Sequence, residues 1–166
     1  MAETVGGAGA AAGNGEAAPQ QQLVVNAQYV KDLSFENPRA PQSLMQQAQP
    51  PEVQIGVDVK AQSLGQDIYE VLLTINANAK SGADAVFMVE LTYAALVTAR
   101  GAPQELLAPL LLVETPRLMF PFARAIISNA TREGGFPPLL IHPVDFADLL
   151  RRQQQAAAQG PTTATA

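Results

Sequence analysis

The chain has 166 residues, of which 48% are hydrophobic and only 15% are charged, with a formal net charge of −5. This length and apolar content suit one domain with a modest core, and the low charged fraction indicates a surface that partner subunits cover. The negative charge argues against nucleic acids and anionic membranes as partners, and the lack of cysteine excludes disulfides and thiolate metal sites.

The two ends of the chain are expected to be disordered. Residues 1–22 are rich in Ala, Gly and Gln and bury too little apolar surface to offset the entropy of ordering, and residues 153–166 form a polar tail. The N-terminus has no basic start followed by an apolar segment, and the longest apolar run, near residues 106–113, is too short to cross a bilayer. We therefore expect a cytoplasmic protein with no membrane insertion, whose single domain spans residues 23–152.

Four runs of alternating apolar and polar residues predict four half-buried strands, at residues 23–36, 53–59, 69–77 and 87–97. All four place their apolar residues at odd positions. Short turns near Gly65 and at residues 81–84 make an antiparallel meander of the last three strands. Prolines in residues 37–52 forbid regular structure there and predict an extended crossover that adds the first strand at an edge.

A long helix is predicted over residues 115–132, with Thr115 as its cap and a double glycine as its stop. Pro121 predicts a kink or restart within it, and Pro109 disturbs a shorter helix before it. A short last helix, capped by Asp145, completes an α+β fold. The long helix is apolar on more than one face, so a second surface should cover it in addition to the sheet. Its apolar residues are Leu118, Met119, Phe122, Ala125, Ile126 and Ala130.

The sequence offers little for catalysis. His142 is the only histidine, and a packed or surface histidine is a better interpretation than a general base. The sequence has no nucleophile elbow, no phosphate-binding loop and no constellation of metal ligands. We predict no enzyme activity, no catalytic residue, no metal and no cofactor.

Two groups of residues suggest binding instead. Leu44 and Met45 in the crossover and Phe136 after the long helix are apolar side chains on irregular backbone, which either bind varied partners or anchor their loops on the core. The even positions of the strands form an acidic sheet face, which is either a solvated surface or a docking site for a basic partner. Its carboxylates are Asp32, Glu36, Asp58, Glu70 and Glu90.

Four segments, which lie in order within residues 23–152, closely resemble the SecB family of bacterial protein-export chaperones. They are YVKDLSFENPRAP at 29–41, DIYEVLLTINANA at 67–79, FMVELTYAAL at 87–96 and PRLMFPFARAIISNATREGGFPPLLIHPVDFADLL at 116–150. The resemblance implies a four-stranded antiparallel sheet with a long helix and a short C-terminal helix, assembled as a homotetramer that is a dimer of dimers. It also implies an ATP-independent holdase that keeps secretory precursors unfolded and passes them to the SecA motor.

The resemblance assigns roles to particular residues. Asp32, Glu36, Met88 and Glu90 correspond by position to the SecA-docking surface of the family. Leu44, Met45 and Phe136 are candidates for the lining of its client-binding grooves. The alternative is a non-catalytic oligomeric adaptor that docks a basic partner through the acidic face while its grooves are closed.

Overall fold

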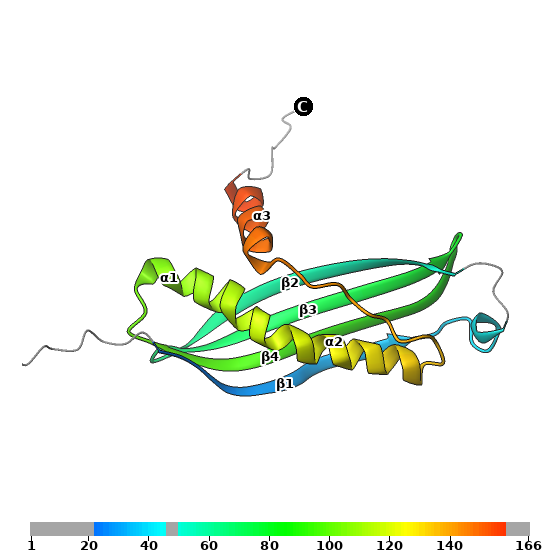
Figure 1. The fold of residues 1–166 in the computed structure, drawn as a ribbon, viewed down its shortest axis with the longest axis horizontal. Coiled ribbons are helices and arrows are strands. Elements are labelled where there is room, and N and C mark those ends of the chain that lie inside the picture. Colours follow the sequence, from blue (N-terminus) through cyan, green and yellow to red (C-terminus); the bar gives the residue numbers. More distant parts are fainter. Residues whose placement is uncertain (1–21, 46–49, 159–166) are drawn as a thin grey trace, which may run out of the picture.

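In the computed structural model, residues 22–45 and 50–158 are described, and four of their segments form one antiparallel sheet (Figure 1). The strands are β1 (Gln22–Glu36), β2 (Glu52–Gly65), β3 (Ile68–Ser81) and β4 (Asp84–Arg100), in the order β1-β4-β3-β2. The predicted α+β fold, meander and edge position of the first strand are confirmed. Of the tails predicted at residues 1–22 and 153–166, residues 1–21 and 159–166 lie outside the described residues, whereas Gln22 begins β1 and residues 153–158 are helical.

One continuous helix of 30 residues, Gln104–Glu133, lies across one face of the sheet (Figure 1). It consists of α1 (Gln104–Pro109), the π-helical segment η2 (Leu110–Glu114) and α2 (Thr115–Glu133). By length and composition alone it could cross a membrane. In this fold its inner side, which includes Met119 and Ile127, is buried in the core.

Two details of the predicted helix were wrong. Thr115 does not cap a helix start, because it lies within the continuous helix and its hydroxyl donates to the Leu110 carbonyl oxygen at 2.9 Å. Of the kink or restart predicted at Pro121, the restart is absent, because α2 runs through this residue without a break. The irregularity lies earlier, where the wider π turn separates Pro109 from Pro116, two residues that lack the N–H an α-helix would use.

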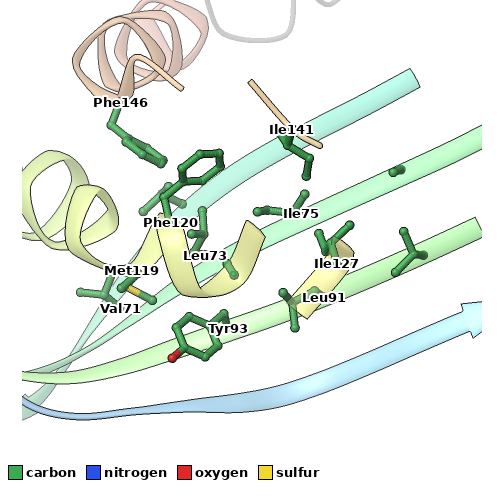
Figure 2. Packing of buried hydrophobic residues seen from close by; sticks show 14 of the residues in the cluster. Val71, Leu73, Ile75, Leu91, Tyr93, Met119, Phe120, Ile127, Ile141 and Phe146 are labelled. Carbon is green, nitrogen blue, oxygen red and sulfur yellow. The ribbon is translucent and has the colours of Figure 1, made fainter. Parts of the chain in front are cut away.

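The core lies between the sheet and the helix. The link between α2 and α3 (residues 134–145) and the start of α3 (Phe146–Ala158) close one side of it (Figure 2). Phe120 of α2 meets Phe146 of α3 edge to face, with ring centroids 5.9 Å apart. The odd-numbered residues of β3 and β4 supply the floor of this core, as the alternation predicts. The fully buried ones among them include Val71, Leu73, Ile75, Leu91 and Val97.

The alternation predicted that the odd positions of the first strand all face the helix, and the structure contradicts this prediction for part of β1. Register shifts at residues 25–27 and 30–32 each insert an extra residue into β1, and each reverses the direction of the side chains that follow. Ala27 and Tyr29 therefore lie on the face that the helices leave open, opposite in direction to Val25. After the second shift the odd positions return to the helix-covered face.

The crossover and the last helix also differ from the prediction. The crossover is not extended throughout, because it contains the 3-10 turn η1 (Gln42–Leu44). The last helix ends at Ala158 instead of near residue 152, since its Gln and Ala residues are good helix formers. Asp145 caps it as predicted, by accepting a bond from the Asp148 N–H at 3.0 Å, and Gln153 ties it to Asp58 of β2 at 2.9 Å.

Candidate functional site

An apolar groove with a volume of about 580 Å³ lies between the crossover and the link after α2. It brings together Leu44, Met45 and Phe136, the three residues that the sequence had put forward, from segments far apart in the chain. Leu44 and Met45 are 49% and 68% exposed, so neither is buried as an anchor in the core. Pro50 and Pro51 add further apolar surface from the crossover.

The floor of the groove comes from the sheet, and sequence reasoning missed it. Val53 of β2 and Phe87 of β4 both line the groove and both pair with Ala79 of β3, so they form one row across three strands. Their odd positions put both residues on the helix-covered face, but only the strand register shows that they lie under the link.

Three aromatic rings meet at this end of the sheet. The centroid of Phe87 is 4.9 Å from that of Phe136 and 5.9 Å from that of Phe35. These distances are in the range in which aromatic pairs stabilise each other beyond their area of contact. The link is thus attached to the sheet by ring contacts, and Phe136 is partly buried while it still lines the groove.

The two glycines after α2 shape the groove as well as ending the helix. Gly135 has φ +88°, a left-handed conformation that favours glycine, and a Cβ there would lie 3.0 Å from Leu44 Cδ2. The crossover can therefore approach the end of the helix closely, so that Leu44 and the link form two sides of one groove.

The second candidate site is the open face of the sheet. Asp32, Glu36, Met88 and Glu90 all lie on this face, where β1 and β4 pair through Glu36 with Met88 and through Ser34 with Glu90. Three of the four candidates, Glu36, Met88 and Glu90, line a shallow hollow of about 310 Å³. Asp32 is exposed in the next row, opposite Thr92. Alternation thus places all four on one surface, although β1 contains two bulges.

Glu70 does not belong to the solvated acidic surface, contrary to the prediction. It is 6% exposed and both its oxygens accept bonds from the Lys31 ammonium, at 2.8 and 2.9 Å. Tyr29 donates to it at 2.5 Å and Gln62 also donates to it. The bulges of β1 bring Tyr29 and Lys31 within reach, which the alternation pattern could not reveal.

This network changes the acidity of its members. The bonds from Lys31 and then Tyr29 hold the pKa of Glu70 below its usual value, because they stabilise the charged carboxylate. The bond to Glu70 raises the pKa of Tyr29, with a smaller contribution from burial. The negative charge of Glu70 is thus compensated by Lys31. The exposed carboxylates among the docking candidates of the open face are Asp32, Glu36 and Glu90.

The structure also places the histidine and the possible metal ligands of the sequence. His142 is exposed on the link between α2 and α3. Within residues 22–45 and 50–158, no group of three or more His, Cys, Asp or Glu residues is placed to hold a metal ion.

Comparison with solved structures supports the fold. The chain is similar to a SecB-like chaperone of Mycobacterium tuberculosis, solved in complex with a ChAD peptide from the HigA1 antitoxin. The TM-score is 0.62 at 15% sequence identity, and the match covers 74% of this chain and 90% of that one. At this identity the similarity establishes the fold alone.

Comparison with known sequences establishes the family. The family model described as "Preprotein translocase subunit SecB" matches residues 16–157. The protein-export protein SecB of Bradyrhizobium sp. strain BTAi1 is 54% identical over 149 residues, covering 89% of this chain and 92% of that protein. The SecB of Bradyrhizobium diazoefficiens is 50% identical over 153 residues, covering 89% and 95%. The resemblance found in the sequence motifs is confirmed, and the chain belongs to the SecB family of protein-export chaperones.

Proposed function

We propose that this protein is an ATP-independent holdase that binds unfolded secretory precursors in its apolar groove and delivers them to the SecA motor. The observation that carries the proposal is the open groove lined by Leu44, Met45 and Phe136, in which the side chains of Leu44 and Met45 reach solvent instead of filling the core. The SecB-like chaperone of similar fold was solved with a peptide bound, which supports peptide binding as a property of this architecture.

Selectivity for unfolded chains follows from the nature of the groove. An apolar groove with few polar groups recognises exposed apolar segments of many sequences, because flexible side chains such as Met45 repack against different shapes. A native protein has buried such segments. Several grooves on one oligomer would then hold a long unfolded chain by avidity, with modest affinity at each site. None of these steps requires a nucleotide.

Assembly of a homotetramer, a dimer of dimers, would supply those several grooves. The outer side of α2 carries an apolar stripe at helical spacing, formed by Leu118, Pro121, Phe122 and Ala125. Leu118 and Phe122 are 53% and 54% exposed in the single subunit. Large apolar side chains spaced along one helix favour coverage by another copy of the chain. That copy would be the second surface that the sequence indicated for the long helix.

Delivery to SecA is assigned to the open sheet face. Asp32, Glu36 and Glu90 are exposed carboxylates on one flat surface, and Met88 adds apolar contact among them. Such a surface would attract a basic partner and raise the rate of association. The face lies on the opposite side of the sheet from the groove, so the motor and the client could be bound at the same time. Because clients would be held before export, we propose that the protein acts in the cytoplasm.

The experiment that tests the holdase is suppression of aggregation. The protein should prevent aggregation of a chemically unfolded polypeptide at stoichiometric amounts without ATP, and light scattering should give the mass of a tetramer. The adaptor alternative predicts docking of the basic partner with no such suppression. A monomer that leaves aggregation unchanged would reject the proposal.

A further inference from the structure

Residues 136–139 form one wall of the groove, and their backbone is hydrogen-bonded to α2 through one residue, Thr131. Phe136, Pro137, Pro138 and Leu139 all line the groove. The two prolines have no N–H, so Phe136 and Leu139 carry the only backbone donors of this wall. The Phe136 N–H bonds the Thr131 carbonyl oxygen at 3.1 Å, and the Leu139 N–H bonds the Thr131 hydroxyl oxygen at 2.9 Å.

Thr131 is built into the helix in a way that aims its hydroxyl at the wall. It is 0% exposed, and its hydroxyl donates toward the carbonyl oxygens of Ile127 at 3.1 Å and Ser128 at 3.0 Å, one turn earlier. With the hydrogen directed at the helix, the oxygen presents its lone pairs to Leu139. The branched side chain has little rotational freedom in a helix, so this acceptor is fixed in place.

We propose that Thr131 is a positioning residue for client binding, which sets the place of the Phe136–Leu139 wall and with it the width of the groove. This inference rests on the proposed function, because it assumes that the groove is where clients bind. Without the hydroxyl, the Leu139 N–H loses its acceptor and the wall moves to find another. Phe136 and Pro138 then no longer face Leu44 across the groove at the same distance.

The test compares three variants of the full chain. Thr131→Val removes the hydroxyl and keeps the branched shape, whereas Thr131→Ser keeps the hydroxyl. Thr115→Val is the matched control, because Thr115 lies in the same helix, is also 0% exposed, and bonds only within the helix, to the Leu110 carbonyl oxygen. Binding is measured with fluorescently labelled, reduced and carboxymethylated lactalbumin, a permanently unfolded polypeptide. Hydrogen exchange of the Leu139 amide is measured in the absence of lactalbumin.

Thr131→Val should weaken lactalbumin binding about five- to tenfold, if the free energy of the lost hydrogen bond is transmitted in full to binding. It should also accelerate hydrogen exchange of the Leu139 amide. Thr131→Ser should restore both, and Thr115→Val should change neither. Equal weakening by both valine variants, or accelerated exchange with unchanged binding, would overturn the proposal. If the unaltered protein bound no lactalbumin, the proposed function itself would fail. Exchange at Leu139 would still decide whether Thr131 holds the wall.

Discussion

The ring of Phe35 lies directly against the backbone of Gly134, so closely that a Cβ atom at this glycine would stand 2.2 Å from Cζ of the ring. Gly134 has φ −73°, which any residue can adopt, so its identity is required by space and not by conformation. The same ring stacks with Phe87 in the groove floor. The helix end, the edge strand and the groove are thus joined at one point of contact.

Gly134→Ala should therefore destabilise the fold by about 1 to 3 kcal/mol through overpacking. Urea denaturation followed by circular dichroism measures this loss. Phe35→Ala in the same chain removes the obstructing ring, so the double variant should lose less stability than the sum of the two single losses. Strictly additive losses would show that the ring of Phe35 is not the cause of the loss at Gly134.

Much of this arrangement could be predicted from the sequence, because alternation and proline or glycine positions are local signals. The meander, the end of α2 at Gly134 and the shared face of Glu36 and Glu90 all follow from such signals. The contacts of Phe35 and the burial of Glu70 could not be predicted. Both depend on the register between strands and on two bulges in β1, which are set by tertiary packing and leave no mark in the residue pattern.

Replacing Leu44 and Met45 together by Asp should abolish most client binding, because two charges in the apolar groove must be desolvated when a client segment covers them. We expect affinity for an unfolded polypeptide to fall at least about tenfold, with little loss of stability, since both side chains are exposed. Fluorescence anisotropy of the labelled polypeptide measures the affinity.

Leu64→Asp is the control for this change. Leu64 is 56% exposed at the end of β2 and does not line the groove. This variant should bind clients like the unaltered protein. If the Leu44 and Met45 variant kept full client binding, the clients would bind elsewhere, and the assignment of this groove as the client site would be rejected.

Glu70→Gln should lower stability at pH 7 by about 1 to 3 kcal/mol, because it removes the charge that Lys31 and Tyr29 bond. The folded pKa of Glu70 lies below its usual value, so the unfolded chain takes up the proton first as pH falls. The stabilisation is complete above the usual pKa of about 4.3 and is lost as pH falls through the folded value.

The stability difference between the two proteins should therefore be largest near neutral pH and shrink below about pH 4. Urea denaturation over that pH range measures it. Glu52→Gln, at an exposed carboxylate of β2, serves as the control and should show no comparable loss at pH 7. A difference that stayed constant with pH would show that Glu70 acts by shape and not by charge.

Leu118→Asp with Phe122→Asp should dissociate the proposed tetramer, because charges on the apolar stripe of α2 oppose its burial by another copy. Light scattering at fixed protein concentration should report a mass near that of a dimer or a monomer. The Leu64→Asp variant should keep the mass of the unaltered protein. An unchanged mass in the stripe variant would move the interface elsewhere.

Reversing the charge of Asp32 and Glu90 to Lys should weaken SecA binding while leaving client binding intact, because both side chains lie on the open face, away from the groove. Exposed charges act over a Debye length of about 10 Å at 0.1 M salt and about 3 Å at 1 M, so the loss should be greatest at low salt. Glu105→Lys with Glu133→Lys makes the same change in net charge on the helical side. If this control weakened binding equally, overall charge and not the docking surface would govern the encounter; an effect confined to Asp32 and Glu90 places SecA on the open face.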